Sequence, residues 1–223
     1  MPTNRPGSNG TRILSGILIK WTLAAMLALA AGVQTLGGKE EAMPDLKGKK
    51  VLMIIAATDF RDEEFFEPYN RLRQCGAAVT VASSVKGAAT SMFGKTVTAE
   101  QPIADCRAED YNAIVFIGGS GASAFFKNAS AHALAKAAVE QDKVLAAICI
   151  APVTLANAGV LKGKKATGFP SIRDQLAANG AQVVSRDVVQ DGKLLTATGP
   201  QAVREFAATL VEMLDKFFAA KNL

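Results

Sequence analysis

The strongest constraint on the fold is a set of apolar runs too short to be free-standing helices. Residues 51–57 (VLMIIAA), 113–119 (AIVFIGG) and 144–148 (VLAAI) are continuous and apolar, as expected for strands buried on both faces of a parallel sheet. Segments with apolar residues at helical spacing alternate with them, for example residues 62–75, which are followed by Gly76. This alternation predicts an α/β protein whose mostly parallel sheet is covered by helices on both faces.

The rest of the chain continues the same pattern. In chain order we expect a strand at 79–83, a hairpin within 86–103, helices at 123–141 and 153–161, a strand at 164–169, a helix at 171–180, a hairpin around Asp191-Gly192 within 181–198, and a helix at 201–218. Asp-Gly is a preferred pair for a two-residue hairpin turn. No internal repeat interrupts this order, so a single α/β domain is expected.

The first 33 residues differ from the rest, because they contain basic but no acidic residues and include an apolar run. This pattern is typical of a secretory signal peptide cleaved after about Ala30, or of an uncleaved N-terminal anchor. We therefore predict a signal peptide or anchor at residues 1–33, a linker at 34–48 and one domain at 49–223. The expected location is extracytoplasmic, either exported or held at a membrane through that segment alone.

Charge and cysteine content exclude several classes of site. The first 39 residues carry four positive and no negative charges, so the formal net charge of +5 leaves +1 for the remainder. A nearly neutral domain predicts no nucleic-acid partner. Cys75, Cys106 and Cys149 lie far apart and the chain has one histidine, so we expect no metal site and no cofactor. In an oxidising compartment Cys75 and Cys106 can pair, and the alternative is that both stay reduced and buried.

The segment 143–154 (KVLAAICIAPVT) joins a predicted strand directly to a predicted helix. Pro152 suits the first turn of a helix, where its missing N–H costs nothing. Cys149 should therefore sit on a tight strand-to-helix turn at the carboxyl edge of the sheet. Nearby helix N–H groups lower the pKa of a thiol, and the thiolate is its reactive form. The alternative is that Cys149 is a small buried apolar residue.

Two other predicted strand ends carry polar or glycine-rich segments. Residues 58–64 (TDFRDEE) follow the first strand, and Gly118-Gly119 end the strand at 113–119. Ligands bind at the carboxyl ends of strands in open parallel sheets. Each segment has an ordinary alternative, an acidic helix start in the first case and a tight turn in the second. Their convergence with the cysteine turn predicts a site at this edge.

These segments together resemble the ThiJ/PfpI superfamily, which includes an archaeal intracellular protease and the Parkinsonism-linked deglycase. The matching motifs cover about residues 49–218 and are DFRDEEFFEP, AAVTVAS, FIGG, AAICIAP and LANAGVLKGKKATGFPSIRD. The resemblance implies a flavodoxin-like three-layer α/β/α sandwich of the class I glutamine-amidotransferase-like type. It also implies a homodimer or a higher homo-oligomer.

The resemblance also implies a set of site residues. Cys149 matches the cysteine of the nucleophile elbow, and Glu64, four residues before a proline, matches the glutamate that lies against the sulfur. Gly119 and the N–H of Ile150 match the donors of the oxyanion hole, and Gly118 adjoins them. A protonated Glu64 would donate a hydrogen bond to a thiolate or stabilise a sulfinate.

The chain departs from the family pattern in its histidines. Ile150 stands where the proteases have a histidine after the cysteine, and Phe169 stands where deglycase-type members have one before a proline. The single histidine, His132, lies in another segment. A cysteine–histidine ion pair cannot form without a histidine, which argues against proteolysis. Chemistry would then rest on Glu64, the helix dipole and water.

Three functional hypotheses follow. The first is a cysteine-dependent hydrolase, lyase or deglycase that acts on small carbonyl compounds. The second is a non-catalytic protein that senses oxidants or protects against stress through oxidation of Cys149. The third is an exported structural or binding module with a relict pocket. In the first two, the ligand at Cys149 is a small molecule or an oxidant.

Overall fold

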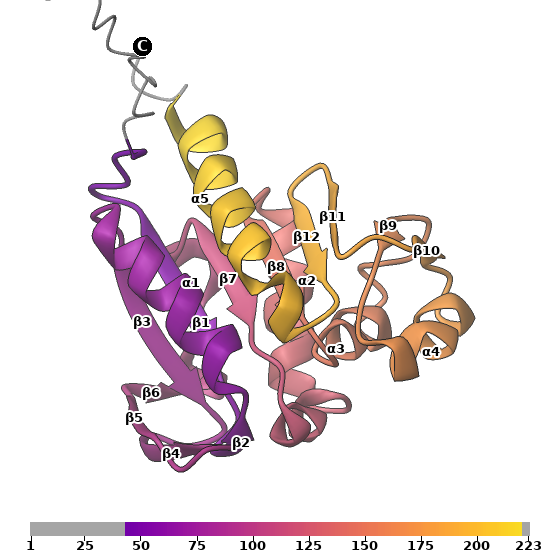
Figure 1. Cartoon of the computed structure of the whole chain (residues 1–223), viewed down its shortest axis with the longest axis horizontal. Helices are drawn as coiled ribbons and strands as arrows, with labels where there is room; N and C mark the ends of the chain where they lie inside the picture. Colours follow the sequence, from indigo (N-terminus) through magenta and orange to yellow (C-terminus); the bar gives the residue numbers. More distant parts are fainter. Residues whose placement is uncertain (1–42, 220–223) are drawn as a thin grey trace, which may run out of the picture. The chain divides into compact units, whose positions relative to one another are not determined.

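The computed structural model describes residues 43–219 of the chain, which form one α/β unit (Figure 1). Its central sheet has seven strands in the order β11-β12-β8-β7-β1-β3-β6, and every neighbouring pair is parallel except β11 and β12. The strands are β1 (Lys50–Ile54), β3 (Ala78–Ser83), β6 (Gln101–Pro102), β7 (Ala113–Phe116), β8 (Val144–Ile148), β11 (Val188–Asp191) and β12 (Leu194–Ala197). The predicted mostly parallel sheet is confirmed.

Helices cover both faces of this sheet. The helices are α1 (Asp62–Gln74), α2 (Ala129–Glu140), α3 (Pro152–Asn157), α4 (Arg173–Ala178) and α5 (Val203–Ala219). Helices α1 and α5 pack side by side on one face, as Figure 1 shows. Helices α2, α3 and α4 contribute to the core on the other face. The result is the predicted flavodoxin-like three-layer sandwich.

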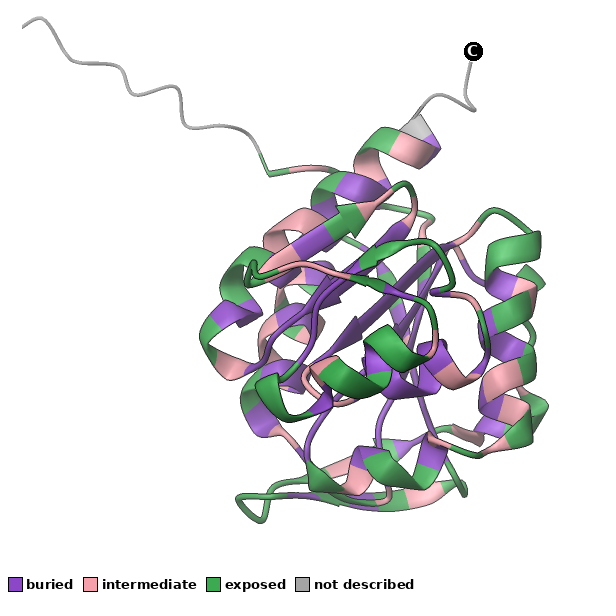
Figure 2. Ribbon diagram, turned by 90° about the vertical axis from the view of Figure 1, so that its right-hand side faces the viewer, coloured by how far each residue is buried: buried purple, intermediate pink, exposed green. Residues whose placement is uncertain are grey.

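The strand sequences explain why both faces are covered. Val51 and Met53 of β1 point into the core shared with α1 and α5, whereas Leu52 and Ile54 point into the other core. Side chains alternate between faces along a strand, so an uninterrupted apolar run is stable only when both faces are buried. Figure 2 shows the central strands as almost continuously buried between partly exposed helices.

Smaller elements surround the central sheet. One three-stranded sheet contains β2 (Thr58–Phe60), β4 (Gly87–Ser91) and β5 (Thr96–Ala99), and a two-stranded sheet contains β9 (Lys165–Ala166) and β10 (Gln182–Val183). The 3₁₀ turns are Ile103–Asp105, Ala108–Asp110, Ser120–Phe125, Pro170–Ile172 and Pro200–Ala202. The hairpin predicted within 86–103 is confirmed as the antiparallel pair β4–β5.

Some predicted boundaries need correction. The helix expected at 123–141 is a 3₁₀ turn that ends at Phe125, followed by α2, because the Asn128 side chain accepts a hydrogen bond from the Ala131 N–H at 2.9 Å and caps a new helix. The hairpin expected within 181–198 is confined to β11 and β12, since β10 pairs with β9 instead.

Candidate functional site

Cys149 lies on the predicted turn between β8 and α3. Its backbone is in the left-handed region with φ of +64°, which is rare for a residue other than glycine. The Cys149 N–H donates to the Ala197 carbonyl at 3.0 Å, and its own carbonyl accepts from the Phe169 N–H at 2.8 Å. Neighbouring segments therefore hold the turn from both sides. Cys149 is half-buried and packs against the core beneath α1 and α5.

Glu64 is the third residue of α1, and its side chain is fully buried. Gly118 explains how this carboxyl group comes next to Cys149. A Cβ atom at Gly118 would lie closer than 3.0 Å to both Glu64 Oε2 and Cys149 Cβ. The absence of a side chain at this position thus provides the space in which the acid and the cysteine meet. The sequence identified Gly118 only as a neighbour of the backbone donors.

The pKa of the Glu64 carboxyl group is raised to near neutrality in the folded protein. Burial raises its pKa from 4.5 to about 7, against the opposing effects of the Cys149 thiol, the Arg61 charge and the Gly118 N–H. Neither carboxyl oxygen has a hydrogen-bond partner of standard geometry within residues 43–219. Since little compensates the lost hydration of the anion, the neutral form is favoured in the folded protein.

The sequence-based expectation of a lowered thiol pKa is wrong. Burial and the negative charge of Glu64 raise the pKa of Cys149 to about 12, although the N–H groups of Gly119 and Ile150 oppose this rise. These are the two predicted backbone donors, and desolvation and the neighbouring carboxylate outweigh their effect on the pKa of the thiol. The acid and the thiol behave as a coupled pair, in which the charge of one group disfavours the charge of the other.

Gly199 borders the carboxyl group, and Phe169 borders Gly199. A Cβ atom at Gly199 would lie 3.8 Å from Glu64 Oε1 and 3.6 Å from Phe169 Cδ2. Phe169 is 39% exposed, so an apolar ring occupies the rim of the site. His132 is elsewhere, with its Nε2 at 2.9 Å from the Phe126 carbonyl oxygen, and acts as a structural residue of α2.

Arg61 is a neighbour of the site that the sequence did not reveal. Its N–H donates to the Gly118 carbonyl at 3.0 Å, and its guanidinium pairs with Glu63 at 2.8 Å. The guanidinium also lies over the ring of Phe93, 4.9 Å from its centroid. Its charge acts on Glu64, as described above. The acidic run TDFRDEE contained the residue but gave no sign of this placement.

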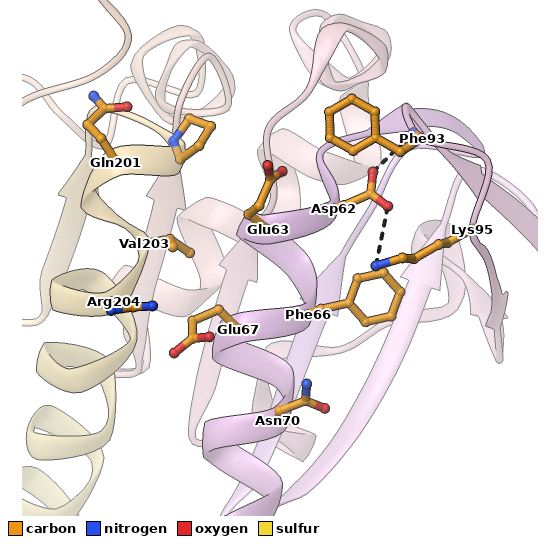
Figure 3. A pocket seen from close by; sticks show the side chains of 11 residues that line it. Asp62, Glu63, Phe66, Glu67, Asn70, Phe93, Lys95, Gln201, Val203 and Arg204 are labelled. Carbon is orange, nitrogen blue, oxygen red and sulfur yellow. Dashed lines mark hydrogen bonds and ion pairs between the residues drawn. The ribbon is translucent and has the colours of Figure 1, made fainter.

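Asp62 fixes the β4–β5 hairpin to the start of α1. It is almost fully buried, and its carboxylate accepts hydrogen bonds from the Ser91 hydroxyl at 2.8 Å and from the Phe93 N–H at 3.2 Å. Between α1 and the start of α5 lies a groove of about 640 Å³ (Figure 3). Glu67 from α1 and Arg204 from α5 line it. This groove lies beside Glu64 but does not contain Cys149.

The described residues contain no group of three or more histidine, cysteine or acidic side chains placed to hold a metal ion. Cys75, Cys106 and Cys149 are all free thiols. Cys75 belongs to the core beneath α1 and α5, while Cys106 packs against the core on the opposite face. The sheet separates these two thiols, so they do not pair.

The fold and the site define a class of flavodoxin-like proteins that carry a cysteine on a strand-to-helix turn beside a buried glutamate. The model of the DJ-1/PfpI family matches residues 49–213. The chain therefore belongs to the DJ-1/PfpI family, as the sequence motifs indicated.

Individual relatives agree with this assignment. An uncharacterised protein of Methanocaldococcus jannaschii is 39% identical, over 91% of this chain and 97% of the relative. The deglycase PfpI of Pyrococcus furiosus is 31% identical, over 73% of this chain and 98% of the relative. The crystal structure of a ThiJ/PfpI domain protein from Brachyspira murdochii is similar with a TM-score of 0.74 and 27% identity, covering 76% of this chain and 98% of that one.

The predicted export or membrane anchoring needs correction. Several relatives are named as deglycases and one as a DJ-1 protein, and these relatives give no support to export. Among residues 43–219, no helix combines the length and apolarity needed to cross a membrane. The predicted location is thus contradicted, and the segment 1–33 on which it rested lies outside the described residues. The division into 1–33, 34–48 and 49–223 stays a prediction.

Proposed function

We propose that this protein is a cysteine-dependent enzyme that acts on small carbonyl compounds, with Cys149 as the nucleophile and Glu64 as the general acid and base. One observation carries the proposal: a fully buried acid with a pKa of about 7 lies next to a half-buried thiol on an elbow. A general acid–base group works best when its pKa is near the working pH. The deglycase name of relatives about 31% identical supports the same class of substrate.

In the first step, the Glu64 carboxylate takes the proton of the Cys149 thiol, and a sulfur electron pair attacks an aldehyde carbon. The C–S bond forms, and the π electrons of the carbonyl move to oxygen. The N–H groups of Gly119 and Ile150, which lower the pKa of the thiol, would donate to this developing oxyanion. Glu64 then gives its proton to the oxyanion, which leaves a neutral hemithioacetal and a carboxylate.

A 2-oxoaldehyde such as methylglyoxal can continue from this intermediate. The Glu64 carboxylate removes the proton from the carbon bonded to sulfur, and an enediolate forms. The hydroxyl proton moves to the neighbouring enediolate oxygen, and Glu64 returns its proton to the adjacent carbon, which gives a thioester of a 2-hydroxy acid and restores the carboxylate. Water hydrolyses the thioester, which releases the acid and restores the thiol, so the net reaction adds one water. No histidine is needed, because one residue alternates between acid and base.

Turnover of methylglyoxal tests this proposal with three variants. Cys149→Ala should abolish the activity, and Glu64→Gln should reduce it strongly because the amide cannot exchange a proton. Cys106→Ala is the matched control and should retain the wild-type rate. A wild-type rate no higher than that of Cys149→Ala would eliminate the enzymatic proposal.

A redox role is the second candidate. It is favoured by Phe169, which stands where deglycase-type members of the family have a histidine that could act as a base. A protonated Glu64 could hydrogen-bond the oxygens of a sulfinate at Cys149. Mild peroxide should then add two oxygens to Cys149, as measured by intact and peptide mass. Glu64→Gln should lower the yield, whereas Cys106→Ala should not. Equal oxidation of all three cysteines would argue against a sensing role.

We also propose that the chain forms a homodimer or a higher homo-oligomer. The exposed ring of Phe93 beside the mixed-charge groove between α1 and α5 supports this proposal. Light scattering after gel filtration should give at least twice the chain mass. Phe93→Glu should lower that mass, whereas Val139→Glu, at an exposed apolar residue of α2, should not.

A further inference from the structure

A second pocket is built on two segments that also border Cys149. Its volume is about 490 Å³, and its lining residues come from the start of α4, the approach to β11 and the first turn of α5: Arg173, Ser185, Arg186, Asp187, Val188 and Glu205. It lies on the carboxyl side of β12, the edge where ligands bind in parallel sheets. The chemistry proposed above does not use these residues.

The segment that contributes Arg173 to the pocket is hydrogen-bonded to the cysteine turn through Phe169. The Phe169 N–H donates to the Cys149 carbonyl, and the 3₁₀ turn at Pro170–Ile172 leads from there directly to Arg173. The side chain of Ile172 packs against Gly168. Arg173 is therefore positioned by a short segment that is hydrogen-bonded to the backbone of Cys149.

The segment that contributes Asp187 to the pocket is hydrogen-bonded to Thr198, which lies next to the cysteine site. The Thr198 N–H donates to the Asp187 carbonyl at 2.9 Å, and the Thr198 hydroxyl donates to the Asp187 carboxylate at 3.1 Å. The next residue is Gly199, which borders the Glu64 carboxyl group. The same two segments therefore line both the pocket and the cysteine site.

The two arginines of this pocket have no anionic partner in the described part of the chain. Neither Arg173 nor Arg186 takes part in an ion pair there. The Nε atom of Arg173 is buried without a hydrogen-bond acceptor. Buried donors are nearly always paired, so an unpaired donor on a charged group indicates a missing acceptor. A ligand with a negatively charged oxygen would supply it.

The acids in the lining narrow the choice of ligand. Asp187 already accepts the Thr198 hydroxyl, and Glu205 adds a second negative charge. These two carboxylates disfavour a dianion such as a phosphate monoester, because like charges repel. A carboxylate carries one charge and matches the fork of an arginine. The lining therefore favours a carboxylate ligand.

We infer that this pocket binds the carboxylate of the carbonyl compound on which Cys149 acts, so that oxo acids are preferred as substrates over neutral aldehydes. The inference rests on the proposed function, since it names the substrate class of the same site. The carbonyl group would lie at Cys149 and the carboxylate between Arg173 and Arg186, with the chain passing the exposed ring of Phe169.

Alkylation of Cys149 by a matched pair of reagents tests the pocket without any turnover. Iodoacetylglycine carries a carboxylate, and iodoacetylglycinamide is its neutral counterpart; homologues with one and two more methylene groups vary the reach. The ratio of the anionic to the neutral rate should be highest for one chain length. At that length Arg186→Gln, an exposed position where folding is not at risk, should lower the ratio about fivefold.

Two further variants complete the test. Arg173→Gln should have a similar effect, and Arg107→Gln, an exposed arginine paired with Glu109 and Asp110, should have none. A ratio unchanged by both Arg173→Gln and Arg186→Gln, or lowered equally by Arg107→Gln, would overturn the inference.

Turnover separates the inference from the proposed function. The wild-type protein is assayed with 4,5-dioxopentanoate, a 2-oxoaldehyde with a carboxylate, and with its methyl ester. A preference for the acid that Arg186→Gln removes is the expected result. Equal rates for both compounds would refute the carboxylate site but leave the enzyme proposal intact. Turnover of neither compound, with the alkylation ratio as predicted, would refute only the enzyme.

Discussion

Cys149 and Cys106 are both half-buried, but they pack against the cores on opposite faces of the sheet and their surroundings differ. Burial is the largest cause of a raised pKa for each. The next influence on Cys106 is the Gln101 amide, which lies 3.2 Å from its sulfur and lowers the pKa. The next influence on Cys149 is the charge of Glu64, which raises the pKa. Burial lowers the thiolate fraction of both cysteines, and at Cys149 the ionisation of a neighbouring acid lowers it further.

The largest expected effect concerns turnover. Cys149→Ala should lower kcat/KM for methylglyoxal by at least about a hundredfold, because a covalent intermediate can no longer form. Cys106→Ala should change it less than about twofold, since Cys106 packs against the opposite face of the sheet from Cys149. Steady-state kinetics of both variants measure the difference, and equal losses would show that the two thiols are not distinct.

The second effect is a pH dependence of stability that only the Cys149 region should show. The pKa of Glu64 is about 7 in the folded protein and 4.5 when unperturbed. Between these values the folded state holds a proton that the unfolded state has lost, so the free energy of unfolding falls as pH rises from 4.5 to 7. The fall attributable to Glu64 is about 3 kcal/mol.

Urea unfolding at several pH values measures this slope. Glu64→Gln should remove that part of the pH dependence, whereas Gln101→Leu next to Cys106 should keep it. An identical pH dependence in wild type and Glu64→Gln would contradict the raised pKa of the acid.

The third effect tests the space between the acid and the thiol. Gly118→Ala places a methyl group against both Glu64 and Cys149. Overpacking of this kind costs about 1–3 kcal/mol of unfolding free energy. Gly163→Ala has open space around its Cβ atom and controls for the loss of a glycine, although its φ of +72° carries a strain of about 1 kcal/mol. Gly118→Ala should also separate the pair and weaken the pH dependence, which the control cannot do.

The smallest effect concerns the partner of Cys106. Gln101→Leu removes the amide that lowers the pKa of this thiol. Alkylation of Cys106 at fixed pH should then slow by about two- to threefold, since less thiolate is present. Gln190→Leu, at an exposed hairpin residue, is the matched control. Peptide mass spectrometry of the alkylated protein measures each cysteine separately, and a faster reaction of Cys106 would contradict the assignment.

The elbow could be predicted from the sequence because its determinants are local. An apolar run, a cysteine and a proline follow one another at 144–152, and the structure places Cys149 on the turn between β8 and α3. The alternation of short apolar runs with helical patterns likewise predicted the three-layer fold. These features depend on neighbours along the chain, which periodicity can report.

The electrostatics of the site could not be predicted in the same way. The predicted direction of the Cys149 pKa shift was wrong because the pKa depends on the burial of the thiol and on the charge of Glu64, a residue distant in the chain. The space left by Gly118 is visible only when α1, β7 and β8 are assembled. The pocket around Arg173 and Arg186 combines three separate segments, none of which carries a motif of its own.

The export prediction failed for a related reason. It rested on the composition of residues 1–33, which describes a segment and not the domain that follows. The domain itself carries the family motifs, and relatives found through it give no support to export. A compositional pattern at one end of a chain is weaker than motifs that run through its core.

The most direct test of the coupling between Glu64 and Cys149 is the rate of Cys149 alkylation by iodoacetamide as a function of pH in wild type and Glu64→Gln. At pH 8 the wild-type acid is ionised and its charge opposes the thiolate. The neutral amide removes that charge, so Glu64→Gln should react several-fold faster at pH 8 even though its turnover is lower. An unchanged or slower reaction of Glu64→Gln would show that the carboxylate does not control the sulfur.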